Sequence, residues 1–127
     1  LALMVNGESW LPSSRTCDVT VIPCKNYTHQ TMYRLPIPPS PNLPNMKAIY
    51  LYPSTCFFEA TPVSLGRGTS LPFQVYGHPN MTGYNYSFTP RSVPGAKNPP
   101  QLNKLCHGVN LSNISDEDIC KKGVNLN

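Results

Sequence analysis

Short apolar segments alternate with proline- and glycine-rich segments along the whole chain. Residues 1–5 are apolar and are followed by Asn6 and Gly7, a pair that commonly ends a helix, so this stretch predicts the end of a helix. Residues 18–24 alternate in polarity and are rich in β-branched side chains. They predict a strand that ends at Pro23.

The second half of the chain continues this pattern. Apolar runs at 47–54 and 72–79 predict two more strands, and the run at 106–114 predicts a fourth. Residues 80–104 combine aromatic residues with many prolines and glycines, which favours a long ordered loop. Aromatic residues alternate over 84–88 within it and allow one short strand.

A helix start and a connector complete the expected elements. Ser115 is followed by three acidic residues at 116–118, the pattern of a capped helix N-terminus, so these acids have a structural role. Five prolines lie between residues 34 and 45. Proline fixes φ and lacks a backbone donor, so this stretch predicts an extended connector and a candidate domain boundary.

The composition narrows the function classes. Charged residues make up 13% of the chain, the hydrophobic content of 39% is too high for a disordered tail, and the net charge is +4. The basic residues are scattered singly, whereas nucleic-acid binding usually needs a concentrated basic stripe. An anionic small substrate fits isolated arginines better. The apolar runs are too short for a transmembrane helix, and the first residues do not form an intact signal peptide.

The cysteines do not indicate a metal site. They stand at 17, 24, 56, 106 and 120, without the close pairs that zinc ligands form. We expect small buried hydrophobic side chains, with one disulfide left open as an alternative.

One carboxylate stands out. Glu59 is the only acidic residue between Val19 and Ser115, and it follows Phe57 and Phe58 directly. A carboxylate beside aromatic rings loses solvation, so it must be paired or must shift its pKa. The nearest cation in the sequence is Arg67, which stands between two glycines. Either the two form a structural ion pair, or they line a cleft that holds a polar ligand.

The remaining candidates are weaker. The histidines are far apart and lack ligand spacing, and His78 is the best placed of them because it follows the Glu59 segment. The serines do not lie in a nucleophile elbow. Metal or cofactor chemistry is therefore not expected.

The central motifs resemble a known family. The run YPSTCFFEATPVSLGRGTSLPFQVYGHP, with PPSPNLP before it and YSFTPRSVPGAKNPP and CHGVNL after it, resembles the NamZ-type exo-β-N-acetylmuramidases. These are bacterial glycoside hydrolases of peptidoglycan recycling. The most specific part is FE-x-T-x-x-S-x-GRGT-x-x-PF, and the resemblance covers nearly the whole chain.

The resemblance implies an α/β fold with an active site between two domains. Residues 1–36 would form the C-terminal edge of a Rossmann-like domain. Residues 37–127 would begin a smaller α+β domain with long proline-rich loops. The family removes terminal N-acetylmuramic acid, and its proposed catalytic acid lies in a Glu-His-Gly-Phe motif that this chain lacks. The chain would therefore need a missing N-terminal part as its partner, in a periplasmic or secreted enzyme.

The resemblance also carries over individual residues. Glu59 would be an acid/base or an acceptor for a substrate hydroxyl, and either Arg67 or Arg91 would bind the muramyl carboxylate. Other candidates for substrate binding, together with the best histidine, are Asn42, Ser64, Gly68, Thr69 and His78. Ala60 and Pro62 depart from the family pattern. They leave open an alternative, a non-catalytic domain that binds muramyl saccharides.

Overall fold

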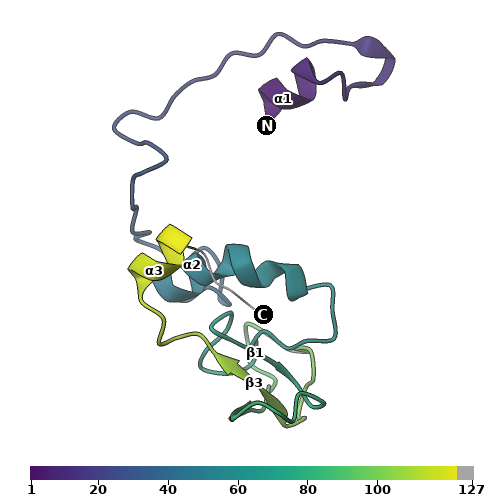
Figure 1. The fold of residues 1–127 in the computed structure, drawn as a ribbon, viewed down its shortest axis with the longest axis vertical. Coiled ribbons are helices and arrows are strands. Elements are labelled where there is room, and N and C mark those ends of the chain that lie inside the picture. The colour runs from purple at the N-terminus through teal and green to yellow at the C-terminus, as the bar shows by residue number, and fades with distance from the viewer. Residues whose placement is uncertain (123–127) are drawn as a thin grey trace. The chain divides into compact units, whose positions relative to one another are not determined.

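A computed structural model describes residues 1–122 and divides the chain into two units, Leu1–Tyr33 and Arg34–Asn127. The N-terminal unit contains helix α1 (Ala2–Gly7) and a short 3-10 helix, η1 (Pro12–Ser14) (Figure 1). The predicted helix is confirmed, although it includes Asn6 and Gly7. None of the helices described is long and apolar enough to cross a membrane.

The predicted strand at 18–24 is wrong. These residues have no regular secondary structure, and Val21 and Ile22 are exposed. A strand is stable only when a neighbouring strand pairs with its backbone groups. Alternating β-branched residues supply the side-chain pattern, but within the described residues no such neighbour pairs with this stretch.

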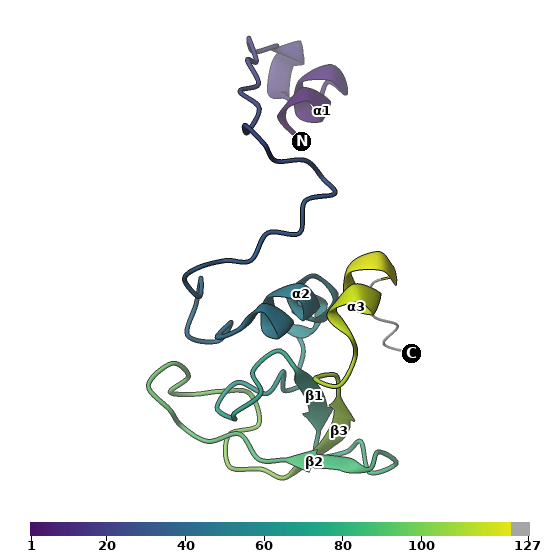
Figure 2. The same cartoon turned by 90° about the vertical axis from the view of Figure 1, so that its left-hand side faces the viewer.

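The second unit is built on a three-stranded antiparallel sheet. Its strands are β1 (Val75–His78), β2 (Tyr86–Phe88) and β3 (Cys106–Asn110), in the order β1-β3-β2 (Figure 2). The sequence predicted the first and third of these strands and allowed the second, each with longer bounds than the structure shows. The fold is thus a small mixture of helices and antiparallel sheet.

The predicted strand at 47–54 is also wrong, because these residues form a helix. Helix α2 (Met46–Thr55) is followed by a 3-10 turn, η2 (Cys56–Phe58). The Asn45 side chain accepts a hydrogen bond of 2.9 Å from the Ala48 backbone N–H and so caps the helix. Buried residues recur at helical spacing, at Ala48, Leu51 and Thr55.

The predicted capped helix is confirmed as α3 (Asp116–Lys122). The Ser115 hydroxyl accepts from the Asp118 backbone N–H at 3.1 Å, and it donates to the Asp118 carboxylate, which lowers the pKa of that carboxyl. Lys47 of α2 pairs with Asp116 at 2.5 Å. This pair ties the beginnings of α2 and α3 together.

The hydrophobic core lies between the sheet and these two helices (Figures 1 and 2). Its buried members are Ala48, Leu51, Leu65, Phe73, Tyr76, Leu111 and Ile119. A smaller cluster contains Val75, Phe88 and Cys106, and Val75 precedes Tyr76 on β1. Successive residues of a strand face opposite sides, so both faces of the sheet are covered.

The cysteines differ from the expectation. All five are free thiols, and only Cys106 is buried. Burial raises the pKa of the Cys106 thiol, as expected for a small apolar side chain in a core. The prediction of buried hydrophobic cysteines is therefore correct for Cys106 alone, because Cys56 is half-buried and the other three are exposed.

Candidate functional site

The Glu59 carboxylate has a hydrogen-bond donor on each oxygen. Its Oε1 accepts from Nη2 of Arg67 in an ion pair, and its Oε2 accepts from the Tyr52 hydroxyl at 3.1 Å. Glu59 directly follows η2, which turns the chain back after α2. The side chains of Glu59 and Arg67 are 32% and 35% exposed, so the pair is partly desolvated and still reachable from solvent.

The aromatic setting of the pair differs from the sequence-based picture. Phe57 is exposed, and Phe58 stacks on Tyr76 in the core. The guanidinium of Arg67 instead lies 5.0 Å from the centre of the Phe73 ring, which is fully buried. A cation over an aromatic face is attracted by the ring quadrupole. Contact with Phe73 therefore holds one face of the Arg67 guanidinium and limits the directions from which a ligand can reach it.

The pair borders a small hollow. Its lining is Glu59, Val63, Leu65, Arg67 and Pro100. The volume is about 20 Å³, whereas sites that enclose a small molecule measure roughly 300–1,000 Å³. The hollow therefore has room for one chemical group of a ligand.

The turn after Arg67 is held by its own residues. Thr69 bonds the Gly66 carbonyl through both its backbone N–H and its hydroxyl, at 3.1 and 2.7 Å. Ser64 is fully buried, and its backbone pairs with Gly77 of β1. Both residues thus position the loop that carries Arg67. The Ser64 side chain is fully buried and does not line the hollow beside Glu59, and its contact with substrate stays a prediction.

Gly68 brings Arg91 beside this turn. Gly68 has φ of +79°, and its carbonyl accepts from the Arg91 backbone N–H at 2.9 Å. A Cβ at this position would lie 2.2 Å from the Arg91 carbonyl oxygen. Only glycine combines this φ with so close an approach. The exposed Arg91 side chain donates to Asn103 Oδ1 at 3.0 Å.

Asn42 and His78 have contacts of their own. The Asn42 side chain donates to the Gly95 carbonyl at 3.0 Å and so joins the proline-rich connector to a later turn. His78 lies at the end of β1, where its Nδ1 accepts from the Asn80 backbone N–H at 3.2 Å. These contacts are distinct from those of the Glu59–Arg67 pair.

Tyr52 is the residue whose role the sequence did not indicate. Its ring packs edge-on against Phe73, with 5.1 Å between the ring centres, and its hydroxyl donates to Glu59. This hydrogen bond is the main reason that the pKa of Tyr52 is raised, with the Glu59 charge next. The hydrogen bond between Tyr52 and Glu59 depends on α2 being a helix. The sequence pattern predicts a strand there and so does not indicate this contact.

Replacing Tyr52 by Phe tests this contact through its pH dependence. Because the folded-state pKa of Tyr52 is raised, the stabilisation by its hydroxyl is present below its unfolded pKa of about 10 and is lost as the pH rises through the folded value. We expect Tyr52→Phe to lower the Tm by a few degrees near neutral pH. The difference from wild type should close in strongly alkaline buffer, and a constant difference would contradict the contact.

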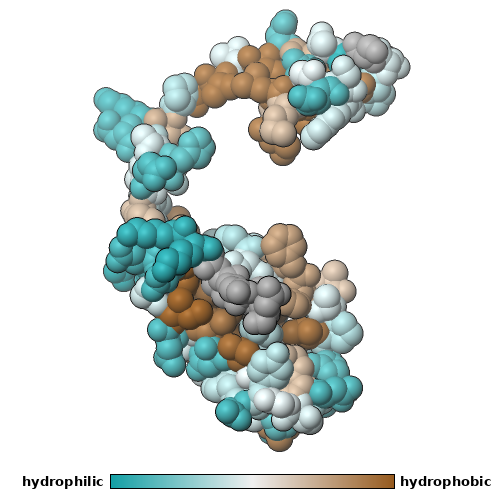
Figure 3. Space-filling view, viewed as in Figure 1, coloured by the Kyte–Doolittle hydropathy of each residue, from teal (hydrophilic) through white to brown (hydrophobic). Residues whose placement is uncertain are grey.

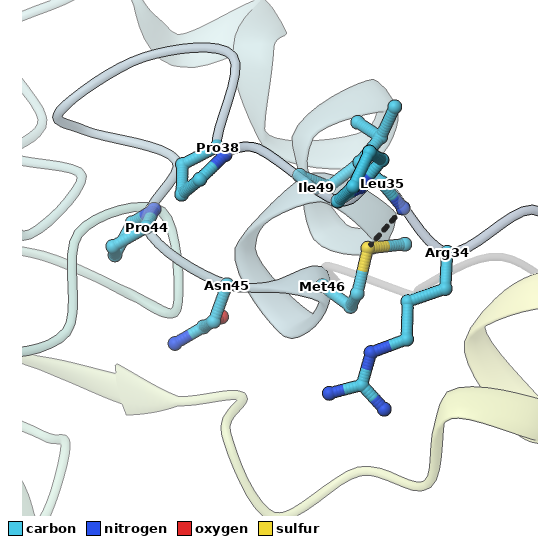
Figure 4. A pocket seen from close by; sticks show the side chains of 8 residues that line it. Arg34, Leu35, Pro38, Pro44, Asn45, Met46 and Ile49 are labelled. Atoms are coloured by element: carbon cyan, nitrogen blue, oxygen red, sulfur yellow. Dashed lines mark hydrogen bonds between the residues drawn. The ribbon is translucent and has the colours of Figure 1, made fainter.

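A larger hollow lies elsewhere in this unit. It measures about 440 Å³, and Figure 4 shows it between the connector and the start of α2. Its lining is Arg34, Leu35, Pro36, Pro38, Pro44, Asn45, Met46 and Ile49. Arg34 is the only charged side chain in this lining, so the hollow lacks the carboxylate or histidine that acid–base catalysis would need. Among residues 1–122, no group of three or more His, Cys, Asp and Glu side chains is placed to hold a metal ion.

Comparisons with known proteins agree on one family. Residues 1–47 match the family described as exo-beta-N-acetylmuramidase NamZ, N-terminal, and residues 50–123 match its C-terminal counterpart. Over 93% of its length the chain is 35% identical to the peptidoglycan beta-N-acetylmuramidase NamZ of Bacillus subtilis (strain 168), of which it covers 31%.

A solved structure is also similar. The chain is 90% identical to a DUF1343 family protein from Bacteroides fragilis NCTC 9343, whose crystal structure superposes with a TM-score of 0.84. The match covers 98% of this chain and 35% of that one, so the chain spans about a third of the length of these relatives. With both parts of the family matched in order along the sequence, the chain belongs to the NamZ exo-β-N-acetylmuramidase family.

Proposed function

We propose that the complete protein is an exo-acting glycoside hydrolase that releases terminal N-acetylmuramic acid from peptidoglycan fragments. Residues 34–122 would supply one wall of its active site. The observation that carries this proposal is the Glu59–Arg67 pair, which is partly exposed at a hollow and lies in the part of the chain that matches the C-terminal family model.

Within this site, Glu59 acts as an acceptor and as an anchor for Arg67. Both of its oxygens already accept hydrogen bonds, one from Arg67 and one from the Tyr52 hydroxyl. Glycosidic cleavage normally uses two carboxyl groups, one of them an acid. The acid would come from a part of the protein outside this chain, and Glu59 would orient a sugar hydroxyl against it.

The N-terminal unit would belong to the domain that supplies this acid. Figure 3 shows hydrophobic residues on the surface of this unit. The exposed large apolar side chains of the unit include Leu1, Leu3, Met4, Trp10, Val21 and Ile22. A unit of this size rarely leaves so many large apolar residues in water unless another surface covers them. This supports the proposal that residues 1–33 pack within a larger domain, which we propose is Rossmann-like. We further propose that the complete enzyme is periplasmic or secreted and needs no metal or cofactor.

A second candidate function is the binding of muramyl saccharides without hydrolysis. The same pair favours it, because both oxygens of Glu59 act as hydrogen-bond acceptors, the role that binding a sugar hydroxyl requires. Ala60 and Pro62, next to Glu59, are departures from the family pattern that fit this alternative.

The experiment that separates the two functions is a turnover assay on the complete protein with 4-nitrophenyl β-N-acetylmuraminide. We expect release of nitrophenol and of free N-acetylmuramic acid. Binding of the glycoside without release would favour the binding domain, whereas neither binding nor release would refute both proposals.

A further inference from the structure

Arg67 and Arg91 both lie next to Gly68, and they differ in whether an acidic side chain neutralises their charge. Arg67 is paired with Glu59, which neutralises it. None of the ion pairs found among residues 1–122 involves Arg91, whose described side-chain partner is the neutral oxygen of Asn103. At this end of the unit, Arg91 therefore has a full positive charge that a ligand anion can neutralise.

The available edges of the two guanidinium groups differ in the same way. An arginine binds a carboxylate best through two parallel N–H bonds, and Nε with Nη2 forms one such edge. In Arg67 this edge is taken, because Nη2 donates to Glu59 and Nε is buried. In Arg91 only Nη1 is bound, to Asn103, and the side chain is exposed, which leaves the corresponding edge free for a ligand.

Asn103 holds Arg91 in place from a strained position. Its backbone has φ of +61°, a conformation that Asn tolerates better than most residues. Its N–H donates to the Pro90 carbonyl at 2.8 Å, and its side chain accepts from Arg91 at 3.0 Å. Asn103 thus fixes the two consecutive residues Pro90 and Arg91. The Arg91 backbone is fixed in turn by Gly68, directly after Arg67 in the sequence.

From this geometry we infer that Arg91 is the group that selects the carboxylate of the ligand, and that Asn103 is its positioning residue. The inference rests on the proposed function and deepens it, because N-acetylmuramic acid differs from N-acetylglucosamine by an ether-linked lactic acid. Arg91 then recognises the lactyl carboxylate, while the Glu59–Arg67 pair contacts the rest of the sugar.

The test compares the 4-nitrophenyl muraminide with its lactyl methyl ester in the complete protein. The ester removes the negative charge of the carboxylate and adds only a methyl group. We expect Arg91→Gln to lower kcat/KM for the acid by about 10- to 100-fold, the value of charge-assisted hydrogen bonds, and to change the ester by less than about threefold. Arg67→Gln should affect acid and ester alike.

Asn103→Asp provides a variant that preserves the fold. Aspartate also tolerates positive φ and accepts the same hydrogen bond, but its charge competes with the ligand for Arg91. We expect it to lower the acid-to-ester ratio as Arg91→Gln does, without loss of Tm. An unchanged ratio in both variants, or a ratio that falls only in Arg67→Gln, would overturn the inference. A wild-type protein that neither binds nor cleaves either substrate would instead refute the proposed function.

Discussion

Glu59→Gln is expected to lower kcat/KM of the complete protein on the muraminide by at least about 100-fold, or about 2.7 kcal/mol. The glutamine amide lacks the negative charge that holds Arg67. It also has a single acceptor oxygen, so it cannot accept from Arg67 and from Tyr52 as the two carboxylate oxygens do. The guanidinium, partly desolvated above Phe73, would then be left without its partner. Steady-state kinetics measures the loss.

The fold should tolerate this change. An ion pair that is about a third exposed stabilises a protein by about 1 kcal/mol or less, so the Tm should fall only slightly. Glu117→Gln breaks a more exposed pair with Lys121 on α3 and serves as the matched control, with unchanged turnover expected. If Glu59→Gln lowered the Tm but left turnover and ligand affinity intact, the pair would be only a structural clip.

Gly68→Ala is expected to destabilise the protein by about 2–5 kcal/mol. The methyl group would lie 2.2 Å from the Arg91 carbonyl and 2.9 Å from the Pro99 ring, and φ of +79° is unfavourable for alanine. Urea unfolding of the purified variant measures the change. A shift of the Arg91 backbone can relieve this clash without separating the strands and helices. We therefore expect Arg91 to move in this variant and the preference for the acid substrate over its ester to fall as well.

Gly83→Ala is the control for this substitution. A Cβ there meets no atom within 4 Å, and Gly83 does not have positive φ, so its effect should stay within about 0.5 kcal/mol. Equal stability of the two variants would show that the Gly68–Arg91 contact is not as tight as the structure has it.

Local signals predicted the sheet and the last helix, and failed where the partner of a segment decided its structure. Ser115 and the acids after it mark α3 by themselves. The run at 47–54 has an aromatic and β-branched composition typical of strands, yet Asn45 caps it and core contacts at helical spacing make it α2. Residues 18–24 have the pattern of a strand without a partner strand in the described chain.

The site was predictable only in part for the same reason. The isolation of Glu59 among basic residues pointed to Arg67, and the structure pairs them. The contribution of Tyr52 required the helix, and the support from Phe73 required the loop that brings residues 65 and 73 together. The pairing of Arg91 with Asn103 depends on a left-handed residue that no local pattern marks. The assignment of domains at residues 36 and 37 stays a prediction.

A crystal structure of the complete protein with N-acetylmuramic acid bound tests the roles of Glu59 and Arg91 most directly. We expect a sugar hydroxyl within about 3.2 Å of the Glu59 carboxylate, and the lactyl carboxylate bound by the Nε–Nη2 edge of Arg91. A sugar bound away from both side chains, with the Glu59–Arg67 pair unchanged and in contact with water alone, would contradict these roles.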